Sequence, residues 1–449
     1  MLPLNRGAVK PAPALSTTPA ELIARLPPAI TASLGRAASL AASRGVRLWL
    51  IGGAVRDLLL GMSPDRDIDL AVEGDAVDLA AAMADALGGQ VHARHQEFGT
   101  ATIALPCADI PCGVLMLDLA RTRVESYPQP AMLPVVRPAG IAEDLHRRDF
   151  SINAITIALL ADEDQLQAGD LLDPFDGRGD LADGRLRLLH PTSLRDDPTR
   201  ILRGLRLASR LGLRPDTATA EQIANALAQG YLRLLTPERI LGEICLALDE
   251  PRPDAALALS DAWGVTPQIA PGLAWSEAMA QRFARSRQVG DAHRDVPPNP
   301  QPPTPNPQLN AGLLCYDLSA EQIASIAGRY PLPTPFARLL AELPKLRATA
   351  LTISADTRPG QIDLLLRPYS DAAISVLHYA EAGLTGQRAA HYLREIRPAR
   401  SPLDGRDLQR LGVAPGPMIG KLLAALRAAY LNGDVQTREQ AEQWVRSQM

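Results

Sequence analysis

Short β-type runs and helical segments alternate over the first third of the chain. The run Val46 to Ile51 ends at Gly52-Gly53, which predicts a strand that closes in a tight turn before a helix that starts at Ala54. An alanine-rich stretch at 75–87 has helical spacing, and further β-type runs lie at 67–72, 100–105 and 114–120. These elements predict a small mixed α/β domain that ends near residue 160.

Helical spacing dominates the chain beyond Leu171. The 3.6-residue period is clearest at 197–211, 221–227 and 237–248. Residues 288–309 contain PPNPQPPTPNPQ and predict an extended connector. We therefore expect an α+β protein with five segments: an N-terminal extension and helix (1–44), a mixed head (45–160), a helical part (161–287), a proline-rich linker (288–309) and a C-terminal helical region (310–449).

The overall composition narrows the class of protein. No apolar run approaches the roughly 18 to 20 residues of a membrane span, and prolines interrupt the N-terminus where a secretory signal has its apolar core. We therefore expect a cytoplasmic protein with no membrane partner. The four cysteines are scattered, which favours reduced thiols over a zinc site or disulfides, namely Cys107, Cys112, Cys245 and Cys315.

Charge is distributed unevenly along the chain. The net charge of −4 argues against a protein that binds nucleic acid over its whole surface. Between Arg185 and Arg214, however, eight arginines accompany only Asp196 and Asp197. This local excess suits a surface that contacts phosphates.

The segment SPDRDIDLAV contains two aspartates, Asp67 and Asp69, two positions apart in a β-type run. Side chains alternate along a strand, so both carboxylates point to the same sheet face. Such a pair repels itself unless a cation neutralises it, and an oxygen-only site suits Mg²⁺. Taken alone, the pattern is more often a solvated edge strand with surface aspartates.

The turn upstream of this pair favours a metal site over a solvated edge strand. Gly52-Gly53 followed by a helix that carries Arg56 would direct backbone N–H groups and a guanidinium to one point. Glycine permits close approach of the backbone to phosphate. The turn and the carboxylates together predict a triphosphate site beside a metal site.

Three motifs occur in the order LIGGAVRDLLLGMSPDRDID, EDLHRRDFSINAI and DDPTRILRGLRLASRLG. In this order they resemble the bacterial class II tRNA nucleotidyltransferase and poly(A) polymerase family, over roughly residues 46 to 245. The resemblance implies a polymerase-β-like nucleotidyltransferase head followed by an all-helical neck, body and tail.

The resemblance also implies an activity. The expected enzyme adds C, C and A from CTP and ATP to the 3′ end of tRNA without a template, by transfer that uses two Mg²⁺ ions. A poly(A) polymerase acting on other RNA 3′ ends, or a partial enzyme that adds only CC or only A, is the alternative. A non-catalytic RNA-binding module fits less well because Asp67 and Asp69 are both present.

The family pattern assigns roles to residues of the first two motifs. It places Gly53 and Arg56 at the incoming nucleotide, Asp67 and Asp69 at magnesium, and Arg148 with Asp149 at the ribose or phosphates. The alternative for an isolated arginine-aspartate pair is a surface ion pair at a helix start. Asp144 and Asn153 in the same motif are interpreted as cap or packing residues.

The third motif predicts an amphipathic helix with a cationic stripe formed by Arg200, Arg203, Arg206 and Arg210. In the resembling family, the equivalents of Asp197 and Arg200 contact the edge of the incoming base. An aspartate accepts from the exocyclic amino group of cytosine, which is an ordinary edge contact. Asp197 followed by Pro198 is equally consistent with a simple N-cap.

Asp118, in LMLDLARTR, is a single carboxylate in an apolar β-type run. It is interpreted as a catalytic residue that joins the metal pair as a third ligand, or as a buried structural aspartate. The sequence leaves both readings open.

Overall fold

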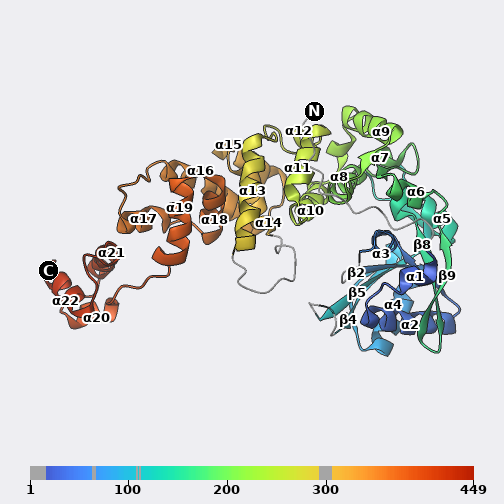
Figure 1. The fold of residues 1–449 in the computed structure, drawn as a ribbon, viewed down its shortest axis with the longest axis horizontal. Coiled ribbons are helices and arrows are strands. Elements are labelled where there is room, and N and C mark those ends of the chain that lie inside the picture. The colour runs from blue at the N-terminus through green and yellow to red at the C-terminus, as the bar shows by residue number, and fades with distance from the viewer. Residues whose placement is uncertain (1–16, 63–66, 108–109, 111–112, 293–305) are drawn as a thin grey trace. The chain divides into compact units, whose positions relative to one another are not determined.

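The computed structural model of the protein describes residues 17–62, 67–107, 110, 113–292 and 306–449, without the side chains of 288–292. Cys112, the N-terminal extension up to residue 16 and most of the proline-rich linker lie outside these ranges. The chain divides into two compact units, one that ends at Thr236 and one that begins at Pro237 (Figure 1).

The first unit is built on a seven-stranded mixed sheet. The strand order is β3 (Gln90–His95), β4 (Thr100–Pro106), β5 (Val114–Arg121), β2 (Asp67–Glu73), β1 (Arg47–Ile51), β8 (Thr156–Asp162) and β9 (Gln165–Leu172). β2 and β5 pair in parallel, and the other neighbours pair antiparallel. Residue 160 falls within β8. The sheet therefore continues beyond the expected end of the head, because the β8–β9 hairpin adds to the edge of β1.

Two helices cover one face of this sheet. α2 (Pro28–Ser43) contacts β1, β8 and β9, and α4 (Ala76–Leu87) contacts β2 to β5 (Figure 1). α4 begins where the Asp75 carboxylate accepts from two backbone amides and ends at Gly88, whose φ is 71°. α2 thus belongs to the head, although the sequence analysis assigned it to a separate N-terminal segment.

The opposite face of the sheet carries α5 (Ile141–His146). Ile141 and Leu145 of this helix share a buried core with Trp49, Ile51 and Ala71. Because side chains alternate along β2, Asp67 and Asp69 point to the same face as Ala71. The chain after α5 therefore emerges on the side of the sheet that carries the acidic pair.

The third motif forms α8 (Thr199–Leu211), with Ile201, Leu205 and Ala208 buried. A Cβ atom at Gly204 would lie 2.8 Å from Cζ of the buried Phe150, so glycine allows the helix to approach the second motif closely. The remaining elements of this unit are α1 (Pro19–Ile23), α3 (Gly53–Leu59), η1 (Gln96–Phe98), β6 (Arg123–Ser126), β7 (Val135–Pro138), η2 (Ser151–Asn153), α6 (Gly177–Ala182), β10 (Arg185–Leu186), α7 (Ser193–Asp196), β11 (Arg214–Pro215), α9 (Thr217–Ala228) and η3 (Tyr231–Leu234).

The described part of the second unit is helical. Its elements are α10 (Pro237–Leu248), α11 (Pro253–Ala262), α12 (Thr266–Ile269), α13 (Glu277–Ala292), α14 (Pro307–Cys315), α15 (Ala320–Arg329), α16 (Thr334–Ala350), α17 (Pro359–Leu366), α18 (Asp371–Ala380), α19 (Leu384–His391), the π-helix η4 (Tyr392–Ile396), α20 (Gly405–Arg410), α21 (Pro417–Leu431) and α22 (Arg438–Ser447). None of the helices in the described ranges is long and apolar enough to cross a membrane.

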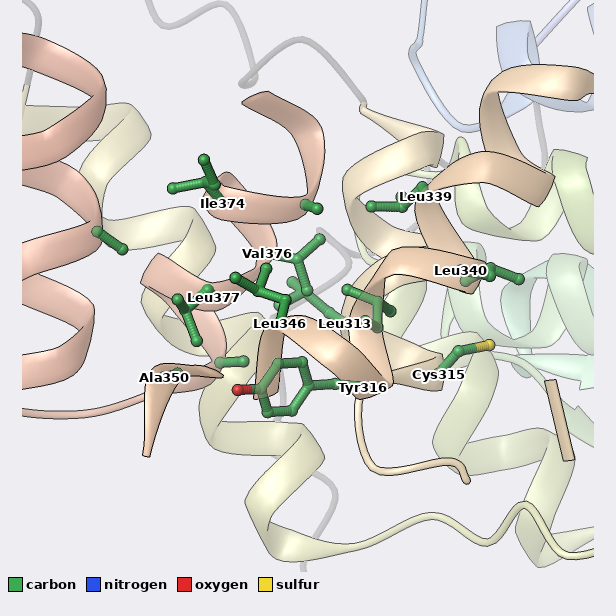
Figure 2. Close-up of a cluster of buried hydrophobic side chains, with 14 of the residues drawn as sticks. Leu313, Cys315, Tyr316, Leu339, Leu340, Leu346, Ala350, Ile374, Val376 and Leu377 are labelled. Carbon is green, nitrogen blue, oxygen red and sulfur yellow. The ribbon is translucent and has the colours of Figure 1, made fainter. Parts of the chain in front are cut away.

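One large apolar core crosses the position of the proline-rich linker. Leu248 and Phe283, before the linker, are buried in the same cluster as Leu313 and Leu346, which follow it. Figure 2 shows Leu313 and Leu346 within this cluster. The sequence predicts that residues 288–309 separate two helical regions, but in the structure the helices on both sides share one core, because α14 and α18 pack against α13. A smaller cluster around Leu408 is formed by α20 to α22.

Candidate active site

The carboxylates predicted from the sequence lie on adjacent strands of the sheet. Asp67 and Asp69 are exposed, whereas Ile68 between them is fully buried. Asp118 on β5 stands directly opposite Asp69 in the parallel register of β2 and β5. Paired residues on neighbouring strands project to the same face. The structure therefore brings all three aspartates to one side of the sheet.

Asp118 also has a partner within the sheet, since its carboxylate accepts a hydrogen bond from the hydroxyl of Thr102 on β4. Over the described ranges, no group of three or more His, Cys, Asp and Glu side chains is arranged to hold a metal ion. The position of Asp118 fits either reading from the sequence, and its role as a third ligand remains a prediction.

The glycine turn meets the acidic strand at one point. Gly52 ends β1 with φ 70° and ψ −126°, a conformation that L-residues rarely adopt, and α3 starts at Gly53. A Cβ atom at Gly52 would lie 3.6 Å from Nη1 of Arg148 and 3.7 Å from Oδ2 of Asp69. Residues of the first and second motifs thus converge as expected from the sequence.

Asp69 lies among charged neighbours of both signs. Burial is the main cause that raises the pKa of Asp69, and the nearby carboxylates of Asp118 and Asp67 raise it further, whereas Arg148 and Arg203 lower it. The side chain is nevertheless exposed to solvent. It therefore lies among many protein atoms but within reach of water. An ion between these like charges would relieve their repulsion, so the residues fit a divalent cation.

Arg148 is held beside this point by a buried carboxylate. Its Nη2 donates to Oδ2 of Asp144 at 3.0 Å, while its Nε is buried and has no hydrogen-bond partner. Burial lowers the pKa of Arg148, and the charges of Asp144 and Asp69 oppose that change. Nη1 of Arg148 lies beside Gly52, and a guanidinium makes charge-assisted hydrogen bonds with phosphate oxygens, so the side chain is suited to an anionic ligand.

Arg56 lies beside the second glycine of the turn, since a Cβ atom at Gly53 would be 3.4 Å from its Nη2, but its bonds are made to other residues. It is only 4% exposed, and its guanidinium donates to Oδ1 of Asp57 at 2.8 Å and to Oδ1 of Asn153 at 2.7 Å. A direct contact between Arg56 and a nucleotide would require it to leave these buried partners. Its predicted role at the nucleotide is therefore kept only as a prediction.

Asp149 is enclosed by donors. Oδ1 accepts from the amide of Phe150 and from Nδ2 of Asn153, and Oδ2 accepts from Nε of Arg203 at 2.9 Å. Burial alone would raise the pKa of Asp149, but Arg203, Arg200 and Asn153 together hold it well below the ordinary value. Hydrogen bonds through Asn153 therefore connect Arg56 on α3 with Arg203 on α8.

Arg200 is turned into the protein and is 5% exposed. Its Nη1 donates to Oγ of Ser193 at 2.6 Å, and its Nη2 donates to the carbonyl of Arg147 at 2.7 Å. Arg203 and Arg210 of the predicted stripe are exposed, and Arg206 is half-buried. The cationic stripe is present, but Arg200 is buried and bonds the backbone of the second motif instead of facing solvent.

Asp197 lies two residues before α8 and bonds the first residue of that helix. Its Oδ1 accepts from the amide of Thr199 at 3.1 Å and from the Thr199 hydroxyl at 2.5 Å. The N-cap position of α8 is Pro198, so the helix begins one residue later than the capping alternative expected. The base-reading role of Asp197 stays a prediction.

Two residues that the sequence analysis treated as cap or packing residues belong to this network. Asp144 holds Arg148, and Asn153 bridges Arg56 and Asp149. The signal available in the sequence was their spacing, because each lies four residues from its arginine or aspartate partner in the same motif.

Comparisons with known proteins identify relatives of this chain. The Poly A polymerase head domain matches residues 48–187. The A-adding tRNA nucleotidyltransferase of Halalkalibacterium halodurans is 31% identical over 424 residues, covering 92% of this chain and 91% of that protein. The CC-adding tRNA nucleotidyltransferase of Deinococcus radiodurans is 35% identical over 394 residues, covering 88% and 87%.

Solved structures resemble the fold over nearly the whole chain. A CCA-adding enzyme in an apo form superposes with a TM-score of 0.75 at 28% identity, covering 95% of this chain and 98% of that one. The Thermotoga maritima CCA-adding enzyme complexed with tRNA has a TM-score of 0.70 at 26% identity, covering 95% and 97%. The expected polymerase-β-like head followed by helical domains is thereby confirmed. The sheet with its acidic face and the relatives that share the chain from end to end lead to one assignment: this protein is a nucleotidyltransferase that belongs to the family of tRNA nucleotidyltransferases.

Proposed function

We propose that this chain completes tRNA 3′ ends by adding C, C and A from CTP and ATP, with Mg²⁺ as the cofactor. The observation that carries the proposal is the convergence of Gly52, Asp69 and Arg148 within a few ångströms. Solved CCA-adding enzymes complexed with CTP and with ATP, each 25% identical to this chain, support the choice of nucleotides. We further propose that the protein acts in the cytoplasm, where these nucleotides and tRNA are found.

Asp67 and Asp69 are the residues proposed to hold Mg²⁺. This ion is commonly bound by one or two carboxylates together with substrate phosphates, so a two-residue protein site is sufficient. When bound, such ions activate the attacking hydroxyl and neutralise charge on the leaving pyrophosphate. Burial is the main cause of the raised pKa of Asp69, but the carboxylates of Asp118 and Asp67 also raise it, and this crowding of like charges supports cation binding at this position.

The reaction joins two substrates. The 3′-hydroxyl oxygen of the RNA attacks the α-phosphorus of the nucleotide, and the bond between that phosphorus and the β-phosphate bridging oxygen breaks. In this proposal Arg148 binds the nucleotide phosphates beside Gly52. Glycine leaves the surface of the turn open to a phosphate oxygen, because there is no Cβ atom between Arg148 and Asp69.

Base selection is proposed to involve α8 and the residues just before it. Asp197 would accept from the exocyclic amino group of C or A, and Arg200 would donate to a ring acceptor, with Arg203 and Arg206 close to the nucleotide. Arg200 bonds Ser193 and a backbone carbonyl in this structure. Base reading by Arg200 therefore requires it to exchange those partners for the nucleotide.

The test uses the purified full-length chain, Mg²⁺ and three tRNA transcripts that end before CCA, after C or after CC. Each transcript is incubated with labelled CTP, ATP, UTP or GTP, and the products are resolved to single nucleotides. The proposal expects C on the first two transcripts, A on the third, and a stop after the added A. A ladder of A residues on unrelated RNA would instead establish a poly(A) polymerase.

A partial enzyme is the second candidate, because the two relatives described above are A-adding and CC-adding enzymes with 31% and 35% identity. The same assay separates the readings. Addition of A only to the transcript that ends in CC identifies an A-adding enzyme, and a stop after two C residues identifies a CC-adding enzyme.

A further inference from the structure

Asp144 occupies the centre of a group of arginines in the first unit. Its side chain is 1% exposed and lies on α5, just before Arg147 and Arg148. Oδ1 accepts from the amide of Arg123 at 3.1 Å and from Nε of Arg147 at 2.8 Å. Oδ2 accepts from Nη2 of Arg148 at 3.0 Å. Each oxygen therefore fixes a different part of the second motif.

The guanidinium of Arg148 is oriented by this contact. Nη2 is bonded to Asp144, and Nη1 lies on the side of Gly52 and Asp69, 3.6 Å from the place of a Cβ atom at Gly52. The guanidinium is planar, so fixing Nη2 also fixes the direction in which Nη1 donates. The buried Nε has no partner. Nη1 is therefore the donor of Arg148 that lies nearest the proposed nucleotide phosphates.

We propose that Asp144 is a positioning residue for nucleotide binding: it holds Arg148 so that Nη1 donates to the triphosphate between Gly52 and Asp69. This inference rests on the proposed function and adds to it a residue that does not touch the substrate. The charge of Asp144 is maintained for this role, because Arg148 and Arg147 hold its pKa below the ordinary value against the opposing effect of burial.

A nearby carboxylate provides a matched control. Glu125 is also buried, with 6% of its side chain exposed, and its Oε1 accepts from Nη1 of Arg147 at 2.9 Å. The same carboxylate pairs with Arg123 and accepts from the hydroxyl of Tyr127. The contacts described for Glu125 do not include Arg148. Glu125→Gln therefore removes a buried charge from the same cluster without releasing the arginine in question.

The experiment compares nucleotide affinities of the full-length wild type, Asp144→Asn, Asp144→Glu and Glu125→Gln. Dissociation constants for CTP and CMP are measured by calorimetry with Mg²⁺ present. In Asp144→Asn the affinity for CTP should fall by about 10- to 100-fold, the range for losing a hydrogen bond to a charged group. The affinity for CMP should change much less, because CMP lacks the β- and γ-phosphates that Arg148 is proposed to contact. Asp144→Glu keeps the charge and should recover part of the CTP affinity.

A double-mutant cycle with Arg148→Met tests whether Asp144 acts through Arg148. Asp144→Asn should cause little further loss of CTP affinity in that background, since the residue to be positioned is absent. The affinity for tRNA without nucleotide should stay within about twofold of the wild type in both single variants. If Asp144→Asn does not fold, Asp144→Glu takes its place in the cycle, and the part of the CTP affinity that Asp144→Glu fails to recover should likewise not be lost a second time in the Arg148→Met background.

Two outcomes overturn the inference. The first is equal weakening of CTP and CMP, and the second is a loss in Asp144→Asn that is fully additive with Arg148→Met or matched by Glu125→Gln. The proposed function fails separately: a wild-type protein that binds CTP but adds no nucleotide to any tRNA transcript would refute the function and leave the binding comparison valid.

Discussion

Replacement of Gly52 by alanine tests the position of the nucleotide most directly. The backbone at Gly52 has φ 70° and ψ −126°, so any L-residue there is strained by about 1–3 kcal/mol. For a unit of this size each kcal/mol corresponds to about 2–4 °C in Tm. The expected loss of thermal stability in Gly52→Ala is therefore about 2 to 12 °C.

The added methyl group should also affect catalysis. Its carbon would lie 3.6 Å from Arg148 and 3.7 Å from Asp69, which are ordinary contact distances, so the protein itself can accept it. A phosphate oxygen cannot occupy the same space as this methyl group, so the nucleotide would be displaced. A displacement of about 1 Å lowers reaction rates by about 100-fold. We expect kcat/KM for nucleotide addition to fall by about that factor, or roughly 2.7 kcal/mol of transition-state stabilisation.

Gly383 provides a control with the same strain. It precedes α19 in the second unit with φ 76° and ψ −142°, and a Cβ atom there would meet nothing within 4 Å. Gly383→Ala should lose similar stability and keep its activity, both measured by calorimetry and by single-nucleotide addition to tRNA. Equal kcat/KM in the two variants would mean that the nucleotide does not occupy the space between Gly52, Asp69 and Arg148.

Three further predictions concern charged residues. Asp69→Asn should lower kcat at least about 1000-fold and yet raise Tm, because a carboxyl whose pKa is raised in the folded state reduces stability at neutral pH; an unchanged kcat would contradict the metal assignment. The pKa of Asp149 is lowered in the folded state despite burial, so its carboxylate should stabilise the fold fully above the ordinary pKa of about 3.9 and lose this effect as the pH falls toward the lower folded pKa. In an acid titration followed by circular dichroism, Asp149→Asn should not show this acid-dependent loss of stability. Arg427→Met should destabilise the second unit by about 3 kcal/mol, because Asp363 is 2% exposed and Arg427 is one of its partners; denaturant unfolding that matches the wild type would contradict this.

The acidic face could be predicted from local pattern alone. Alternation placed Asp67 and Asp69 together, and a glycine pair after an apolar run located the turn of β1. The opposition of Asp118 to Asp69 could not be predicted in this way, because it depends on the parallel register between β2 and β5, which are more than forty residues apart in the chain. Long-range register is set by the packed sheet and leaves no local trace in the sequence.

The orientation of buried polar groups was also beyond sequence reasoning. The helical period placed Arg200 and Arg203 on one stripe, but only packing against the second motif decides that Arg200 is buried while Arg203 is exposed. The shared core on both sides of the proline-rich linker was missed for a related reason. Apolar periodicity identifies which face of a helix is buried, but it does not identify the helix that covers it.

The burial of Arg200 limits how this protein can be changed by design or by evolution. The side chain that the family pattern assigns to the base also binds the carbonyls of Arg147 and Arg148, the second of which belongs to the residue proposed to bind the nucleotide phosphates. A substitution chosen to accept a different base would loosen those carbonyls at the same time. New base preferences should therefore arise more readily through exposed neighbours such as Arg203, or together with compensating changes around Ser193.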